Sequence, residues 1–220
     1  MNVLGWIEDL APDLEEIGDD RPPAPRWDQD WFARLDAAAA YAIVRMTRPR
    51  RIVEVGAGHS TRFLARAVRD GALATQIIAI DPAPRASIRG LPIDWRGRPV
   101  QSSDPALFAS LEAHDMLFID SSHQAKPGSD VEFLFGEALS RLAKGVRIHF
   151  HDVFLPDDYP DAWAWRLYNE QAALAPLIGN SYALEFSSHQ TVKRMRLNGV
   201  LARLPLMAGA LESSLWLIKR

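Results

Sequence analysis

Two glycines, Gly56 and Gly58, stand between an apolar run and a helical pattern, and few folds accommodate such a junction. The apolar run holds three β-branched residues typical of buried strands, Ile52, Val53 and Val55. Glycine lets the backbone turn sharply and approach a ligand closely. Apolar side chains recur at helical spacing from residue 63, and the first N–H groups of a new helix are unpaired. The junction predicts a strand, a turn and a helix whose N-terminus faces a ligand.

The residues around the glycines distinguish two kinds of ligand. A nicotinamide-binding fingerprint requires a third glycine three residues after the second, where this chain has Thr61. The chain instead carries an acid, Glu54, two residues before Gly56. A carboxylate there would repel a pyrophosphate and suits a ligand with a cationic or hydroxyl-rich end. The pattern Glu-x-Gly-x-Gly resembles the first motif of class I S-adenosylmethionine (SAM)-dependent methyltransferases.

Composition excludes several classes of partner. The chain has 220 residues, the size of one α/β domain with a sizeable core. Its formal net charge is −3 and it has no basic run, so neither a nucleic acid nor an anionic membrane is an expected partner. No apolar stretch is long enough to span a bilayer. The absence of cysteine rules out disulfides and thiolate metal sites, and it fits a cytoplasmic protein.

The chain divides into a predicted helical cap or accessory segment at residues 1–48 and one domain at residues 49–220. Prolines at residues 22–25 indicate a stiff connector within the first segment. An alanine-rich stretch at residues 28–46 predicts a helix that ends before Pro49. The tryptophans near it either cover a pocket or pack on the core.

Acidic and hydroxyl side chains follow the predicted strands. Asp81 ends a strand at residues 76–80, roughly 20 positions after the glycines, where an acid can bind both ribose hydroxyls of a nucleoside. The alternative is that Asp81 only caps its own turn. Ser102 and Ser103 follow a third predicted strand at residues 99–101, and they either contact an adenine or cap the next helix.

The next two predicted strands also carry acidic and histidine side chains at or near their ends. A strand at residues 115–120 ends in Asp120 and leads into a polar loop with His123. The strand at residues 145–154 carries His149 and His151 on one face, by alternation, and then Asp152. Because adjacent parallel strands end at the same crevice, we expect Asp120, His151 and Asp152 to lie together.

Residues 51–81, 118–123 and 148–152 together resemble a bacterial class I SAM-dependent methyltransferase, similar to the group often labelled methyltransferase family 24 and distantly like the catechol-type O-methyltransferases. The resemblance implies a Rossmann-like αβα sandwich with a mostly parallel seven-stranded sheet and an antiparallel last strand. It implies SAM as the cofactor. The implied cofactor-binding residues are Glu54, Gly56, Ala57, Gly58, Ser60, Asp81, Ser102, Ser103 and Asp120.

The resemblance also implies a reacting centre. In the catechol-type enzymes, acids ending the fourth and fifth strands hold magnesium and a lysine serves as the base. By position this implies Asp120, His151 and Asp152 as metal ligands and His123 as the base. His151 departs from the pattern, because magnesium prefers oxygen ligands, whereas this set suits Mn²⁺, Fe²⁺ or Zn²⁺ as well. The alternative is a hydrogen-bonded polar cluster without a metal.

The predicted function is transfer of a methyl group from SAM to a hydroxyl of a small molecule, with Asp120, His123 and Asp152 as the catalytic residues. An imidazole is suited to removing a proton near neutral pH. A nicotinamide-dependent oxidoreductase and a non-catalytic SAM-binding protein are the alternatives. The identity of the acceptor and the assembly of a homodimer stay open at this point.

Overall fold

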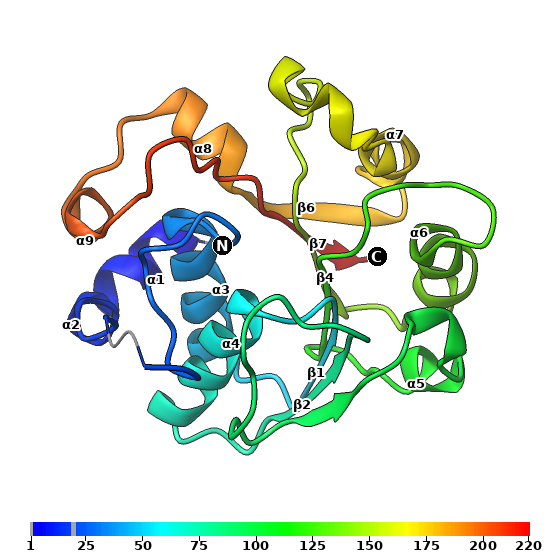
Figure 1. Ribbon diagram of the computed structural model, residues 1–220, viewed down its shortest axis with the longest axis horizontal. Helices are drawn as coiled ribbons and strands as arrows, with labels where there is room; N and C mark the ends of the chain where they lie inside the picture. Colours follow the sequence, from blue (N-terminus) through cyan, green and yellow to red (C-terminus); the bar gives the residue numbers. More distant parts are fainter. Residues whose placement is uncertain (1, 19–20) are drawn as a thin grey trace.

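The computed structural model describes residues 2–18 and 21–220, and a seven-stranded sheet runs through this part of the chain (Figure 1). The strand order is β3-β2-β1-β4-β5-β7-β6. The first five strands pair in parallel, and β7 pairs antiparallel with both β5 and β6. The strands are β1 (Arg51–Val55), β2 (Gln76–Ile80), β3 (Asp94–Arg96), β4 (Met116–Ile119), β5 (Arg147–Phe150), β6 (Tyr182–Ser187) and β7 (Leu215–Lys219).

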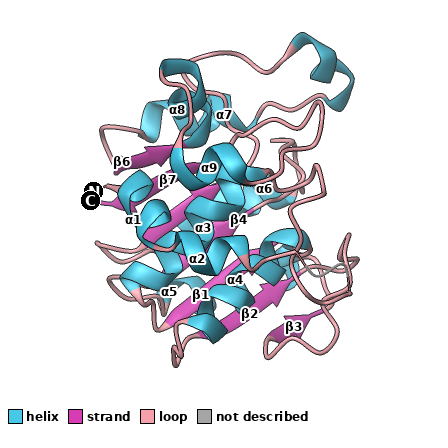
Figure 2. Ribbon diagram, turned by 90° about the vertical axis from the view of Figure 1, so that its left-hand side faces the viewer, coloured by secondary structure: helices cyan, strands magenta, loops and turns pink. Residues whose placement is uncertain are grey.

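Helices cover both faces of the sheet (Figure 2). One face carries α1 (Val3–Asp9), α2 (Ala11–Glu15), α3 (Arg34–Thr47), α4 (His59–Asp70) and α9 (Gly199–Arg203). The other face carries α5 (Ala106–Ala109), α6 (Asp130–Phe133) and α7 (Glu170–Leu174), while α8 (Ser188–Arg194) follows β6. Two hydrophobic cores therefore enclose the sheet, which confirms the predicted αβα sandwich with its antiparallel last strand.

The central strands are buried on both faces, as expected for a parallel sheet covered by helices. One row of neighbouring side chains, Glu54, Phe118, His149 and Trp216, crosses β1, β4, β5 and β7. The rings of His149 and His151 lie 6.1 Å apart, so both histidines face the same side of β5, as predicted. This row brings polar side chains to the inside of the sandwich, beneath the strand ends.

The predicted helix at residues 28–46 begins later, at Arg34. The Gln29 carboxamide oxygen accepts hydrogen bonds from the backbone N–H groups of Trp31 (2.9 Å) and Phe32 (2.8 Å). These bonds hold the preceding residues in a turn, which is why the helix does not extend to residue 28. The helix α3 is buried from residue 35 to residue 44 and packs on the same core as α4.

One other element prediction was wrong. Residues 100–102 form a 3₁₀ turn, and the third strand is Asp94–Arg96 instead, paired with β2. Pro99 has no N–H group to join a strand ladder, which disfavours a strand there. After β5, a 3₁₀ turn (Asp161–Arg166) and α7 are separate elements, because Leu167 between them adopts a left-handed conformation with φ of 56°. No helix among the described residues has the length and apolar character to cross a membrane.

Candidate active site

The carboxyl ends of β2, β1, β4 and β5 lie at one edge of the sheet, because these strands are adjacent and parallel. A cleft opens at this edge, and a second cavity adjoins it through the shared residues Gly56, Asp81 and Asp120. The cleft also contains three further predicted residues, namely His123, His151 and Asp152. Such an edge is where open α/β sheets bind their ligands.

The glycine turn packs against the end of β4. Gly56 has a left-handed φ of 82°, and a Cβ atom there would lie 1.8 Å from the carbonyl oxygen of Asp120. Only glycine therefore allows the two strand ends to approach this closely. The turn residues Gly56, Ala57, Gly58 and Ser60 all line the cleft.

Asp81 binds the glycine turn to the end of β2. Its Oδ2 accepts a hydrogen bond from the Ala57 N–H at 2.7 Å, and its Oδ1 accepts one from the Ala83 N–H at 2.7 Å. The carboxylate is partly exposed and lines both cavities. Asp81 therefore caps its own turn, as the alternative interpretation held. Its carboxylate also lines the cavities beside the glycines, where a ligand could contact it.

Glu54 lies beneath the turn and lines neither of the two cavities. Its side chain is fully buried, and its Oε1 accepts a hydrogen bond from the Ser60 hydroxyl at 2.7 Å. Burial raises the pKa of this carboxyl to about 8, although the Ser60 and Thr61 hydroxyls act in the opposite direction. Glu54 reaches the cleft only through Ser60.

We expect Glu54 to make folding stability fall as the pH rises. A carboxyl with an ordinary pKa of 4.5 and a folded pKa of about 8 holds its proton more tightly in the folded state, so stability is lost between these values. Relative to the wild type, the folding stability of Glu54→Gln should increase by about 1.4 kcal/mol for each pH unit between these two pKa values. Urea unfolding at several pH values measures this gain, and Glu137→Gln, at a half-exposed glutamate paired with Arg141, serves as the control. Parallel curves for Glu54→Gln and wild type would contradict the prediction.

Ser102 and Ser103 do not line either cavity; their neighbour Gln101 lines the second one. Ser103 is buried, and its hydroxyl has no hydrogen-bond partner among the described residues. The residue that borders the predicted adenine side is therefore Gln101. The sequence placed a strand at residues 99–101, and the 3₁₀ turn there changes which side chains face the cavity.

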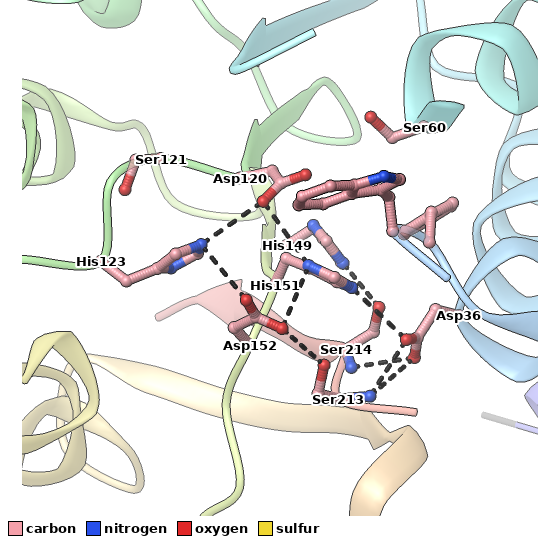
Figure 3. Close-up of polar contacts among 12 residues, drawn as sticks. Asp36, Ser60, Asp120, Ser121, His123, His149, His151, Asp152, Ser213 and Ser214 are labelled. Carbon is pink, nitrogen blue, oxygen red and sulfur yellow. Dashed lines mark hydrogen bonds and ion pairs between the residues drawn. The ribbon is translucent and has the colours of Figure 1, made fainter. Parts of the chain in front are cut away.

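Four side chains at the ends of β4 and β5 point toward one another (Figure 3). The Nε2 atom of His123 lies 3.4 Å from Asp120 Oδ1 and 3.6 Å from Asp152 Oδ2. The Nδ1 atom of His151 lies 3.5 Å from Asp120 Oδ1 and 3.5 Å from Asp152 Oδ1. We call these four residues the acid–imidazole cluster. His123 and Asp152 both adopt positive φ angles, 59° and 53°, a strain often found at functional positions.

The charges in the acid–imidazole cluster shift its pKa values in opposite directions. Burial alone would raise the pKa of Asp120, but the imidazoles of His151 and His123 outweigh it and hold the pKa far below its usual range. Burial alone would lower the pKa of both histidines, but the surrounding carboxylates raise it well above the ordinary value. The surrounding carboxylates therefore favour the protonated form of each imidazole.

Two further acids, which were not predicted from the sequence, face the outer sides of the imidazoles. Glu170, at the start of α7, is buried and lies 2.9 Å from His123 Nδ1. Asp36, in α3, lies 3.4 Å from His151 Nε2 and accepts hydrogen bonds from the Ser213 and Ser214 N–H groups. One signal was available for Asp36, the single acid within a long run of apolar helix residues.

The rest of the cleft is lined by aromatic, basic and aliphatic side chains that were not predicted from the sequence. They come from the turn before α3, the loop after β2, the 3₁₀ turn after β5 and the segment after α9. These residues are Trp31, Phe32, Arg85, Trp163, Arg166, Tyr168 and Leu211. His189, in contrast, pairs with Asp157 at 2.6 Å and does not line the cleft.

The predicted metal ligands do not form a metal site in this arrangement. Among the residues that the structure describes, no group of three or more histidine or acidic side chains is disposed to hold a metal ion. The donor atoms of Asp120, His151 and Asp152 instead face one another as imidazole–carboxylate pairs at 3.5 Å.

Comparisons with known proteins agree with this geometry. Residues 53–153 match the model of a family described as Methyltransferase domain. The structure is similar to the methyltransferase PaMTH1 of Podospora anserina bound to SAH, with a TM-score of 0.54 and 17% identity, covering 100% of this chain and 94% of that chain. It is also similar to an O-methyltransferase from Bacillus cereus in complex with SAH, with a TM-score of 0.51, 14% identity and coverage of 100% and 91%. No curated protein matches the sequence.

A third similar structure belongs to another kind of enzyme. It is a branched-chain polyamine synthase from Thermus thermophilus in complex with N4-aminopropylspermidine and 5'-methylthioadenosine. The TM-score is 0.52 at 13% identity, and the match covers 97% of this chain and 63% of that chain. The fold by itself therefore does not determine which group is transferred.

The strand order, the glycine turn and the cleft at the strand ends define a class I methyltransferase fold, which two SAH-bound methyltransferases share. The family match points to the chemistry that the fold leaves open. Residues 53–153 match the model of the family described as Methyltransferase domain, and together with the fold this match supports a SAM-dependent methyltransferase.

Proposed function

We propose that the chain methylates a hydroxyl oxygen of a small molecule, with His123 as the general base. The observation that carries this proposal is the position of His123 Nε2, which faces Asp120 and Asp152 within the cleft that the glycine turn also lines. An O-methyltransferase is among the similar structures, which supports the choice of an oxygen acceptor.

The cofactor would lie across the glycine turn. The ribose hydroxyls would donate to Asp81, and the adenine would enter the second cavity beside Gln101. The methionine end would lie near Ser60, whose hydroxyl is bound to Glu54. Ionisation of Glu54 beside the positive charges of SAM would then be favoured over its buried neutral form. We do not retain Ser102 and Ser103 as direct contacts, since neither lines the cavities.

Methyl transfer is an in-line displacement, so most of the catalysis comes from holding the acceptor oxygen, methyl group and sulfur in line. The acceptor oxygen bonds to the methyl carbon, the carbon–sulfur bond breaks, and its electron pair stays on sulfur. His123 Nε2 takes the proton of the acceptor hydroxyl, while Glu170 holds the Nδ1 side of the ring at 2.9 Å. Asp120 and Asp152 stabilise the imidazolium that results.

Asp81→Ala is expected to weaken SAM binding severely, by about a hundredfold. The change removes the charge-assisted hydrogen bonds to the ribose and also the bond that holds the Ala57 N–H. Asp81→Asn is the matched control, because it keeps one acceptor and the side-chain volume, and it should bind more tightly than Asp81→Ala. Calorimetry with SAM measures both affinities. An unchanged affinity in Asp81→Ala would remove Asp81 from the cofactor site.

The proposed function is tested with methyl-labelled SAM and a panel of small phenols, catechols, sugars and hydroxy acids. Label appearing as the methyl group of a new methyl ether on one acceptor supports the proposal. Binding of SAM without transfer to any of them would favour the non-catalytic alternative. A change in the absorbance of NADH on mixing with the protein would favour the oxidoreductase.

The metal prediction has a direct test that does not depend on the acceptor. Elemental analysis of the purified protein detects bound Mg, Mn, Fe or Zn, and treatment with EDTA removes it. Because the imidazole–carboxylate pairs satisfy one another, we expect transfer to survive EDTA with less than about a twofold loss. A large loss that is restored by one of these ions would show that the cluster rearranges around a metal.

Three other expectations stay predictions. They are the division into an accessory segment at residues 1–48 and a methyltransferase domain at residues 49–220, a cytoplasmic location, and a homodimer. For the first, Trp31 and Phe32 line the cleft, so the segment before residue 49 contributes to it as well as to the core.

A further inference from the structure

One wall of the cleft carries an arginine whose hydrogen-bond donors are only partly used. Arg166 ends the 3₁₀ turn Asp161–Arg166, and its side chain is 25% exposed. Its Nη1 donates a hydrogen bond to the Tyr168 hydroxyl at 3.3 Å. Its Nε is shielded from solvent and has no hydrogen-bond partner within the described chain. A buried N–H group of a charged side chain without a partner is costly, so it indicates a missing acceptor.

Two arginines of similar burial in the described chain are paired closely with a carboxylate. Arg34 lies 3.0 Å from Glu212, and Arg51 lies 3.1 Å from Asp115. The carboxylate near Arg166 is that of Asp152, at 3.9 Å, which is beyond hydrogen-bond distance. Arg166 therefore has the burial of a paired arginine without the close partner.

The guanidinium of Arg166 is held in place by aromatic rings. Its Cζ lies 4.1 Å from the ring centre of Trp163 and 5.5 Å from that of Tyr168. The backbone oxygen of Arg166 accepts a hydrogen bond from the Gln124 carboxamide at 2.9 Å, which ties the turn to the loop that carries His123. The donors are thus oriented before any ligand arrives.

The same arginine lies close to the proposed general base. Asp152 Oδ2 is 3.6 Å from His123 Nε2 and 3.9 Å from Arg166 Nη1. A single small molecule can therefore contact both nitrogens, with its hydroxyl at the imidazole and a second group at the guanidinium.

We propose that the methyl acceptor is a small hydroxy acid and that Arg166 binds its carboxylate. This inference rests on the proposed methyl transfer at His123. A guanidinium presents parallel N–H donors that match the two oxygens of a carboxylate. The Arg166 charge offsets the repulsion from Asp152, and the aromatic rings of Trp163 and Tyr168 line the same cleft. The carboxylate is unchanged in the reaction, and only the hydroxyl of the acceptor forms a bond to the methyl carbon.

The test compares acids with their neutral amides on protein saturated with SAH. The probes are 2-, 3- and 4-hydroxybenzoate and the three matching hydroxybenzamides, and calorimetry measures their affinities. At least one acid should bind about ten- to a hundredfold more tightly than its amide. Arg166→Gln should remove this preference, whereas Arg166→Lys should keep part of it. The exposed Arg196→Gln is the matched control and should behave as the wild type.

Three results would overturn the inference: no acid binds more tightly than its amide, no probe binds at all, or Arg166→Gln keeps the preference. Thermal unfolding and SAH affinity, which should be unchanged in every variant, show that a lost preference does not reflect a lost fold. Transfer of labelled methyl to acids and amides alike would leave the proposed function standing and overturn this inference alone. Absence of transfer to any hydroxyl compound would count against the proposed function itself.

Discussion

His123→Gln is expected to lower the rate of methyl transfer by about a hundred- to ten-thousandfold, the usual contribution of a general base. The affinity for SAM should stay within about twofold, because His123 lies among Asp120, Asp152 and Glu170 rather than at the glycine turn. Asp152→Ala should act in the same direction. Single-turnover measurements with labelled SAM, together with calorimetry, separate the two effects.

The wild-type rate should also rise with pH. The surrounding carboxylates raise the pKa of His123 well above its ordinary value, so the neutral imidazole that can accept a proton becomes abundant only above that range. His189→Gln is the matched control, since His189 pairs with Asp157 outside the cleft. The double variant His123→Gln with Glu170→Gln avoids a buried, unpaired carboxylate. If both His123→Gln and the double variant transferred methyl groups at rates within a few-fold of wild type, His123 would be excluded as the base.

Gly56→Ala is expected to lose roughly 3–5 kcal/mol of folding stability and to abolish SAM binding. A Cβ atom at Gly56 would lie 1.8 Å from the Asp120 carbonyl oxygen, which belongs to the backbone and cannot rotate away. The ends of β1 and β4 would have to separate, and the cleft between them would change shape. Urea unfolding and calorimetry with SAM measure the two losses.

Gly136→Ala is the control for the loss of a glycine. A Cβ atom there would meet nothing within 4 Å, so the change should leave SAM binding untouched and alter stability by less than about 1 kcal/mol. If Gly56→Ala resembled Gly136→Ala in both measurements, the close packing of the turn against Asp120 would not be needed for the site.

The sequence predicted the parts of the site that depend on local patterns. The glycines between β1 and α4, the acid after β2, and the polar residues after β4 and β5 all follow from strand ends and alternation. The structure brings Asp81, Asp120, His151 and Asp152 to one edge of the sheet, as such patterns indicate. The orientation of Glu54 was harder to predict, because its neighbour Ser60 comes between it and the cleft.

The residues that the sequence did not reveal reach the site from distant segments. Glu170 meets His123 across 47 positions, and Asp36 meets Ser213 across 177 positions. The hydrophobic periodicity of these segments does not predict such contacts, because the contacts depend on how distant helices and strands pack together. Arg166 could not be assigned for a related reason: it ends a 3₁₀ turn, and its position in the cleft depends on the left-handed residue Leu167 that follows.

Asp36 ties two distant segments of the chain to the site. Its carboxylate, in the buried helix α3, accepts hydrogen bonds from the N–H groups of Ser213 and Ser214 immediately before β7. Without these serines the carboxylate would lack its donors in an apolar interior, which is unfavourable. The acid that faces His151 therefore has its hydrogen bonds only when the segment before β7 is docked against α3.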